Sequence, residues 1–345
     1  MGEAPSEETK VFYRVVDKIR KIFAFIITFL TGTFKKFIRQ SYVVMKNEIK
    51  KYFSGKRMFV FLALLAIIVF VLVVAPYMFG SKANPVYFLM MSSLVVLMAS
   101  TLFASISIVA EYEERTALIV FTRPIRKTSI FIGKALACLV LTVAFTALYY
   151  VIAAIVSLCV NGDLSIDILT SFGLACAYAF GTIGIAMFVS SIMKKGSTAT
   201  IITFVVLAVI ITALSMVLNA ANVNSSWMID QAANSIMECS EEYRNMMNEM
   251  YADLAKMLAD PTTFIDENYY VSSLFAGMSY EQLVAALVTP VDTAYHTAWT
   301  LMGASQEIGD LSVSAPDYVR DTFVMIGWGI VAMVAAFVAF LRREF

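Results

Sequence analysis

Few residues in this sequence have the types and spacing that catalysis or metal binding requires. The single histidine, His296, has no second imidazole with which to hold a metal or a haem. No C-x-x-C pair occurs among the four cysteines, so neither a zinc nor a redox motif is indicated. Gly133-Lys134 is followed by Ala135 and lacks the preceding glycine of a phosphate-binding loop. We therefore expect a chain that is not an enzyme, uses no metal or cofactor and cannot hydrolyse ATP.

Residues 111–134 contain the set of side chains best suited to act together. Acidic residues open this segment, where they suit the positive N-terminal end of a short helix, and apolar residues give the helix a hydrophobic side. Pro124 ends it and starts the next helix. A short surface helix held between two membrane spans can pass force from a cytoplasmic partner into the membrane. The residues predicted to contact this cytoplasmic partner are Glu111, Glu113, Glu114, Arg115, Thr116, Leu118, Ile119, Phe121, Pro124 and Arg126.

The elements that position this segment are the helices of a membrane protein. Of the 345 residues, 60% are hydrophobic and 15% are charged, whereas a soluble domain has about 45–50% apolar and about 25% charged residues. A helix crosses a bilayer with about 20 mostly apolar residues. Six windows without Asp, Glu, Lys, Arg or His qualify: 58–79, 86–110, 135–160, 168–193, 198–218 and 322–341. The sequence predicts an all-α integral membrane protein with six transmembrane helices.

Lysines and arginines near the span ends predict the orientation. Residues 1–57 carry thirteen of them, and more flank the links after spans two and four and the C-terminus. Residues 219–321 hold three basic residues against fifteen acidic ones. We expect a multi-pass protein of the cell membrane with both termini in the cytoplasm. The chain then divides into a cytoplasmic region (1–57), spans one to five (58–218), an external helical insertion (219–321), and span six with its tail (322–345).

Residues 10–53 have helical periodicity but no window long enough to span a bilayer. The uncharged stretch 22–34 has 13 residues, about 20 Å of helix, and basic residues flank it on both sides. These features fit an amphipathic helix in the cytoplasmic interface, with Phe23, Ile26 and Leu30 on its membrane side. A short seventh span, which would place the basic N-terminus outside, is the competing interpretation.

The external insertion is also predicted to be helical. Apolar residues recur at steps close to 3.5 over residues 228–258, which predicts one amphipathic helix that ends at Pro261. Shorter helices are predicted at 280–288 and 291–302. Together they could form a small lid or a dimer contact, and a loosely packed insertion is the alternative.

The six windows argue against ion or proton transport through the spans. Secondary transporters usually place a carboxylate or an interrupted helix at the membrane midplane, and we expect neither here. Small residues on one face of the fourth span instead predict close helix packing, either within the chain or against a second subunit. These residues are Gly173, Ala177, Gly181 and Gly184.

The loop after the second window resembles the permease subunits of type-2 ABC exporters. That family typically has an acidic residue after the second span, then a Thr, then a Pro with Arg or Lys two residues on, and a Lys before the third span. The matching residues are Glu111, Thr116, Pro124, Arg126 and Lys134. The family usually has Gly just before the Thr, where this chain has Arg115. The link 190–197, the ending 341–345 and the segment 47–51 are also similar to the family.

The resemblance implies the permease subunit of an exporter, which dimerises with a second permease subunit as a homodimer or heterodimer. A separate cytoplasmic ATP-binding-cassette ATPase subunit would drive it by contacting the 111–126 segment as a coupling helix. The alternative is a non-transporting mechanotransmission or assembly subunit that uses the same ATPase to move the external helices. A plain membrane scaffold is a third hypothesis. Membrane lipid is an expected partner and nucleic acid is not, because the net charge is zero. The substrate stays open.

Overall fold

The computed structural model describes residues 35–78, 83–113, 126–160, 162, 166–221, 223–259 and 312–342. Over these residues all the regular elements are helices, and six helical segments are long and apolar enough to cross a membrane. The predicted all-α architecture with six spans is therefore confirmed. The spans are α2 (Lys56–Met78), α3 (Pro85–Phe103), α6 (Lys127–Val160), α7 (Ile166–Ile192), the continuous α8 (Gly196–Val205), η1 (Val206–Ile210) and α9 (Ile211–Ala220), and α14 (Tyr318–Arg342).

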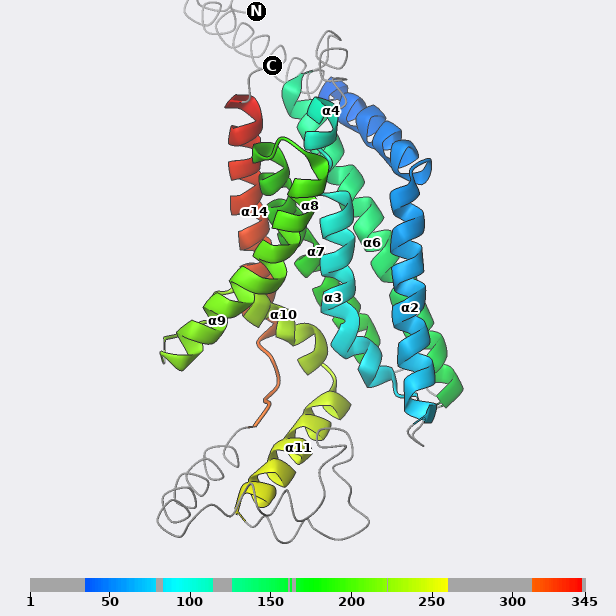
Figure 1. The fold of residues 1–345 in the computed structure, drawn as a ribbon, viewed down its shortest axis with the longest axis vertical. Helices are drawn as coiled ribbons and strands as arrows, with labels where there is room; N and C mark the ends of the chain where they lie inside the picture. The colour runs from blue at the N-terminus through cyan, green and yellow to red at the C-terminus, as the bar shows by residue number, and fades with distance from the viewer. Residues whose placement is uncertain are drawn as a thin grey trace, which may run out of the picture.

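The central helix of the bundle is α7, which α3, α6 and α14 surround (Figure 1). It crosses α14 at two glycines, because a Cβ atom added at Gly184 would lie 2.7 Å from the carbonyl oxygen of Gly329. Only glycine allows backbones to approach this closely. In the small-residue face predicted for this span, Gly181 and Gly184 lie in helix contacts, Ala177 is half-buried and Gly173 is exposed.

The N-terminal region is described from residue 35 onward. Residues 35–53 form a helix that leads into α2 through a bend at Ser54 and Gly55. Lys35 and Lys36 lie at the start of this helix, which is inclined to α2 in Figure 1. The residues that we placed in the membrane interface, Phe23, Ile26 and Leu30, lie outside the described residues.

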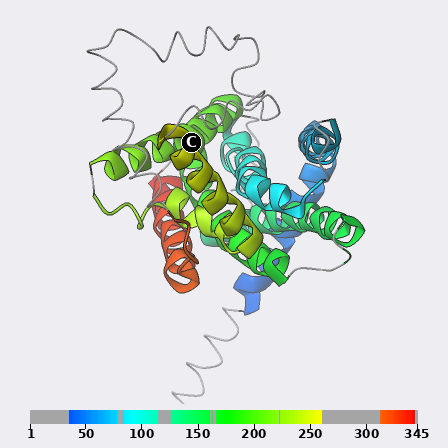
Figure 2. The same cartoon turned by 90° about the horizontal axis from the view of Figure 1, so that it is seen from below.

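The first span, α2, stands at the edge of the bundle (Figure 2). Only 11% of its spanning window is buried. Its main buried anchor is Phe61, whose ring centroid lies 4.9 Å from that of Phe145 in α6 and 5.7 Å from that of Phe103 in α3. Tyr52 packs edge-on against Phe103 from the preceding helix. This aromatic cluster attaches the first span to the rest of the bundle.

The second span ends earlier than its apolar window predicts. We expected an uninterrupted segment over 86–110, but α3 ends at Phe103, residues 104–108 form turns, and a separate helix α4 (Val109–Glu113) follows. The break lies near one end of the bundle. Our expectation concerned an interrupted helix at the membrane midplane, and it stays a prediction. Serine hydroxyls in and before the break donate to carbonyls three or four residues earlier, which competes with regular helix formation.

The fifth span changes its helical geometry midway. It passes from α8 through the π-helical segment η1 into α9, and α9 leans away from the bundle (Figure 1). Apolar side chains on α9 are exposed, among them Leu214, Met216 and Val217. π-helical segments are rare and occur frequently at functional sites.

The insertion begins with two helices, not with the single helix predicted over 228–258. Helices α10 (Ile229–Glu238) and α11 (Glu241–Ala259) are separated at Cys239 and Ser240. α10 packs against α7, α14 and α3 and belongs to the bundle core. Its buried residues are Ile229, Ala232, Ala233, Ser235 and Ile236. The shorter helices predicted at 280–302 lie outside the described residues.

Candidate functional site

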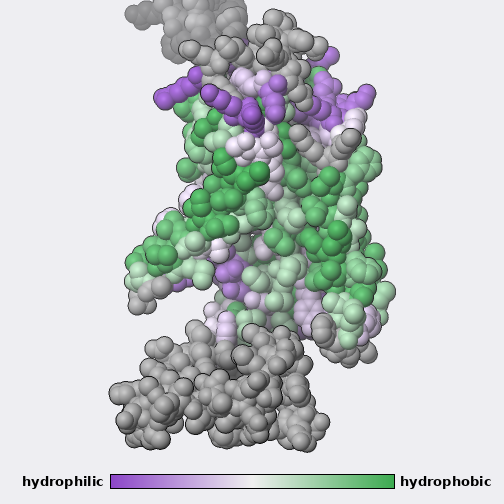
Figure 3. All heavy atoms as spheres, in the orientation of Figure 1, coloured by the Kyte–Doolittle hydropathy of each residue, from purple (hydrophilic) through white to green (hydrophobic). Residues whose placement is uncertain are grey.

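The predicted contact segment falls partly within the described residues. Glu111, Glu113 and Arg126 are described, and the members between them from Glu114 to Pro124 are not. Arg126 is exposed, and its carbonyl oxygen accepts hydrogen bonds from the first turn of α6. The two glutamates lie on α4, at the end of the bundle that also holds the start of α6 and the Lys194-Lys195 link. We call this the basic end, and Figure 3 shows it as a band of hydrophilic surface.

A buried charge cluster joins three segments at the basic end. The Nζ atom of Lys134 in α6 lies 2.8 Å from Oε1 of Glu48 and 2.8 Å from Oε1 of Glu111. The same Nζ donates to the carbonyl oxygen of Ser107 at 2.7 Å. Lys134 is only 1% exposed, and both carboxylates are largely buried. We call Lys134, Glu48 and Glu111 the Lys134 cluster; it connects helix 35–53, α4 and α6.

The break between α3 and α4 supplies the backbone groups that surround this cluster. A backbone polar group at membrane depth needs a partner within the protein. Ser190 of α7 supplies one, because its Oγ accepts the N–H groups of Ile108 at 3.1 Å and of Val109 at 3.2 Å. The hydroxyl of Tyr52 donates to the carbonyl oxygen of Phe103 at 2.7 Å. Side chains from helix 35–53, α6 and α7 therefore hold the interrupted end of the second span.

Close backbone packing aligns the two helices that carry Lys134 and Glu48. A Cβ atom added at Gly133 would lie 2.7 Å from the carbonyl oxygen of Ser41 and 2.7 Å from Cβ of Val44. Glycine at position 133 thus lets helix 35–53 approach α6 closely. The Gly133-Lys134 pair, which does not fit a phosphate-binding loop, therefore has a structural role. Gly133 leaves space for helix 35–53 to pack against α6, and Lys134 forms an ion pair with Glu48 of that helix.

The neighbouring Glu113 ties α4 to the fifth span. Its Oε2 accepts the backbone N–H of Gly196 at 2.7 Å, at the start of α8. A carboxylate in this position complements the unpaired N–H groups and the positive end of a helix. Glu111 and Glu113 thus face different partners, α6 and α8, and α4 is held between the third and fifth spans.

The site connects helices through charged and polar side chains. Within the described ranges, no group of three or more His, Cys, Asp or Glu side chains is close enough to hold a metal ion. The Lys134 cluster instead joins helix 35–53, α4 and α6 by ion pairs. The close packing at Gly133 and the hydrogen bond of Glu113 hold the same helices together. The ammonium group of Lys134 is thus shared by helix 35–53, α4 and α6.

The partners in this cluster could not be identified from the sequence alone. Glu48 was noted only as part of the segment 47–51. Lys134 was noted as part of a pair that does not fit a phosphate-binding loop and as a match to a family pattern. The useful signal was a lysine at the edge of an apolar window, with one glutamate at the end of each neighbouring segment. Ser190 and Tyr52 gave no comparable signal, because serines and tyrosines are common in these helices.

Comparison with known proteins agrees with this geometry. The family described as ABC-2 family transporter protein matches residues 80–345, which include α3 to α14. The chain belongs to the ABC-2 transporter family. It is therefore a multi-pass membrane protein and a permease component of an ABC transporter, and members of this family are membrane components and not ATPases. The family in general works with an ABC ATPase. No curated protein matches the sequence significantly.

Proposed function

We propose that this chain is the permease subunit of an ABC exporter that a separate cytoplasmic ATPase subunit drives through the basic end. Family membership supports a permease role. The sequence contains no phosphate-binding loop of its own, which fits hydrolysis in another subunit. The mechanotransmission alternative requires the external helices to move, but α10, the first helix of the insertion, packs among the spans, so we do not propose that alternative.

The orientation follows from the charge distribution. The basic end carries Lys127, Lys194 and Lys195 around the links of α6 and α8, and α10 and α11 lie at the opposite end (Figure 1). Lysine and arginine accumulate on the cytoplasmic side of membrane proteins. We infer that the basic end, with both chain termini, faces the cytoplasm and the ATPase.

The observation that carries this proposal is the Lys134 cluster. An ATPase that pushes on the 111–126 segment must move α4, because Glu111 and Glu113 belong to that helix. The movement reaches α6 through Lys134 and α8 through the N–H of Gly196. The cluster is buried, so it resists stretching more than a solvated surface ion pair would.

The test is co-expression with an ATP-binding-cassette ATPase encoded beside this chain. We expect Lys134→Met to retain the ATPase during purification but to lose most of the substrate-dependent or lipid-dependent ATPase stimulation in proteoliposomes. Lys46→Met is the matched control, because Lys46 is an exposed lysine on helix 35–53, outside the 111–126 segment and outside the Lys134 cluster. Full stimulation in Lys134→Met, or failure of the unmodified chain to bind an ATPase, would contradict the proposal.

We further propose that the exposed side of α2 and α8 faces the second permease subunit. A groove of about 290 Å³ runs between α2, α3 and α8, and Thr101 and Thr200 bring hydroxyls to its otherwise apolar wall. Ile201→Cys on this side should cross-link to the second subunit in membranes. Phe323→Cys on α14 is an equally exposed control. Cross-linking through Phe323→Cys alone would place the dimer interface on the opposite side.

A further inference from the structure

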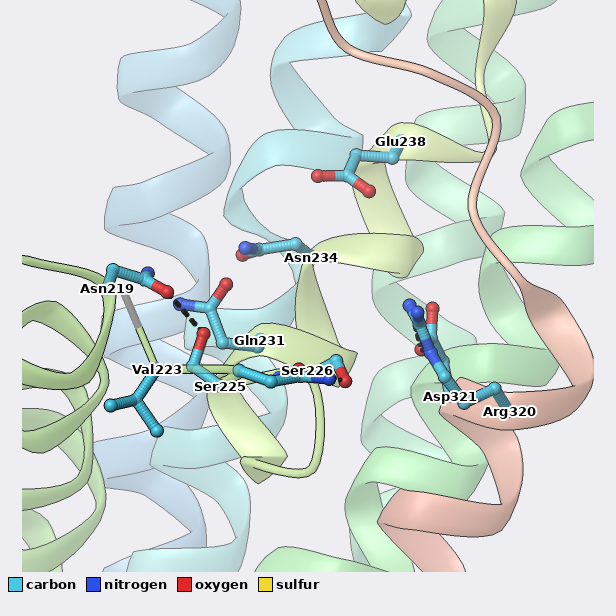
Figure 4. A pocket seen from close by; sticks show the side chains of 10 residues that line it. Asn219, Val223, Ser225, Ser226, Gln231, Asn234, Glu238, Arg320 and Asp321 are labelled. Carbon is cyan, nitrogen blue, oxygen red and sulfur yellow. Dashed lines mark hydrogen bonds and ion pairs between the residues drawn. The ribbon is translucent and has the colours of Figure 1, made fainter. Parts of the chain in front are cut away.

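A polar hollow of about 510 Å³ lies at the end of the bundle opposite the basic end (Figure 4). The end of α9, the loop after it, α10 and the first turn of α14 form its walls. The lining combines four amide side chains, two serine hydroxyls and three charged groups. Figure 3 shows hydrophilic surface directly below the hydrophobic α9. The residues that carry the argument are Asn219, Gln231, Asn234, Glu238, Arg320 and Asp321.

One face of α10 carries polar side chains that line the hollow. Gln231, Asn234 and Glu238 are spaced three and four residues apart and therefore project on the same side of the helix, as Figure 4 shows. The opposite face is buried in the bundle. The side chains of Gln231 and Asn234 make no hydrogen bond to another residue that the structure describes. Each amide thus has both donors and an acceptor available toward the hollow.

The charges of the lining do not favour an anion. The Nε and Nη2 atoms of Arg320 each lie 2.8 Å from Oδ1 of the buried Asp321, so this cation already has a counter-ion. Glu238 adds a second carboxyl group. Burial, and next the charge of Asp321, raise the pKa of Glu238, while Arg320 and Arg244 lower it. A phosphate would meet two acidic groups and a guanidinium that is already bound, whereas a neutral ligand would meet no such repulsion.

Two stacked tryptophans lie beside the hollow. Trp227, next to the lining residue Ser226, stacks on Trp328 of α14 with ring centroids 6.5 Å apart and an interplanar angle of 10°. The indole N–H of Trp328 donates to the carbonyl oxygen of Trp227 at 2.9 Å. Tryptophan is enriched at membrane–water interfaces. The exposed apolar residues of α9, including Met216 and Val217, offer a hydrophobic surface beside the hollow.

We propose that this hollow binds the neutral, hydroxyl-rich headgroup of a membrane amphiphile, such as a glycosyl headgroup. Paired amide donors and acceptors match hydroxyl groups, which also donate and accept. The volume lies in the range of small-ligand sites, about 300–1,000 Å³. The apolar chain of the amphiphile lies along α9. This proposal does not depend on transport or on an ATPase, and a free sugar would present the same headgroup chemistry.

The experiment uses the full chain, purified in a phosphocholine detergent and placed in phosphatidylcholine nanodiscs. The discs are doped separately with glucosyl diacylglycerol, phosphatidylglycerol, phosphatidylethanolamine or diacylglycerol, and native mass spectrometry measures which lipid the protein retains. We expect selective retention of the glucosyl lipid. We expect Gln231→Leu with Asn234→Leu to weaken it about tenfold. Asn47→Leu, at an exposed amide on helix 35–53, is the matched control and should retain it.

Other outcomes would distinguish a glycolipid from a free sugar as the ligand, or would overturn the proposal. A thermal shift with methyl glucoside in solution that equals the shift with the glucosyl lipid would assign the site to a soluble sugar of the same chemistry. Preference for phosphatidylglycerol or phosphatidylethanolamine, or no preference, would overturn the proposal. If the double variant does not fold, the unmodified protein is tested with a glucosyl lipid whose hydroxyls are methylated. Equal retention of that lipid would also overturn it.

Discussion

Replacing Lys134 by methionine is the sharpest test of the Lys134 cluster. Methionine keeps much of the apolar stem and removes the ammonium group, so Glu48 and Glu111 stay buried without their shared cation. At 2.8 Å, each ion pair has a gross attraction of about 6 kcal/mol at an effective dielectric constant of about 20. Desolvation offsets much of this attraction. Measured losses on removing one partner of a buried pair are about 3–5 kcal/mol.

Companion variants identify the origin of the loss. Glu48→Gln should cost less than Lys134→Met, since Lys134 then keeps Glu111 and the carbonyl oxygen of Ser107. The triple change Lys134→Met, Glu48→Gln and Glu111→Gln leaves no buried charge in the cluster, and it should recover most of the stability. The assay heats the detergent-solubilised protein to a series of temperatures and uses size-exclusion chromatography to measure the fraction that stays folded. A Lys134→Met variant that unfolds at the temperature of the unmodified protein, or a triple variant no more stable than Lys134→Met, would refute a stabilising role for the cluster.

Three further predictions concern other regions. Ile119→Ala with Phe121→Ala should lower co-purification of the ATPase, or uncouple its activity, by removing contacts worth about 1–4 kcal/mol, while the permease still inserts; unchanged binding and coupling would exclude this segment from the mechanism. Phe61→Ala should destabilise the protein by about 1–3 kcal/mol, below the 3–5 kcal/mol typical of soluble cores because lipid replaces part of the lost contact, and a lower thermal midpoint with normal insertion would show it. Burial raises the pKa of Glu238, so the folded protein holds this proton more tightly than the unfolded chain does. The midpoint should therefore rise as the pH falls through the folded-state pKa toward the ordinary value of 4.5, and Glu238→Gln should abolish the part of the pH dependence that this carboxyl contributes.

Hydropathy predicted the spans well because crossing a bilayer requires a long apolar helix whatever the tertiary contacts are. All six windows correspond to helices of the structure, including α2, which has few contacts of its own. The ends of the spans depend on neighbours and were predicted less well. The interruption after Phe103 is stabilised by Tyr52, Lys134 and Ser190, which are distant in sequence. A local apolar window cannot reveal such partners.

The insertion shows a similar limit. Its apolar period continues across Cys239 and Ser240 without a Gly or a Pro, so sequence periodicity predicted one helix where α10 and α11 are separate. The break places α10 among the spans, where the hydroxyl of Ser171 donates to the carbonyl oxygen of Ile236 at 2.6 Å. The thiol of Cys239 donates to the carbonyl oxygen of Asp167 at 3.7 Å. Tertiary packing decided the position of this helix, and its composition alone indicated a solvent-exposed segment.

The central helix α7 physically connects the Lys134 cluster with the polar hollow. At the basic end its Ser190 holds the N–H groups of the α3–α4 break, and at the other end its Ser171 binds α10. Between them, Gly184 and Gly329 bring the backbones of α7 and α14 into close contact, which a side chain at position 184 would disrupt. We therefore expect α7 and α14 to move together when α4 is displaced. Since α14 carries Arg320 and Asp321, this movement would shift one wall of the hollow against α10, and the polar contacts offered to a headgroup would change with the state of the basic end.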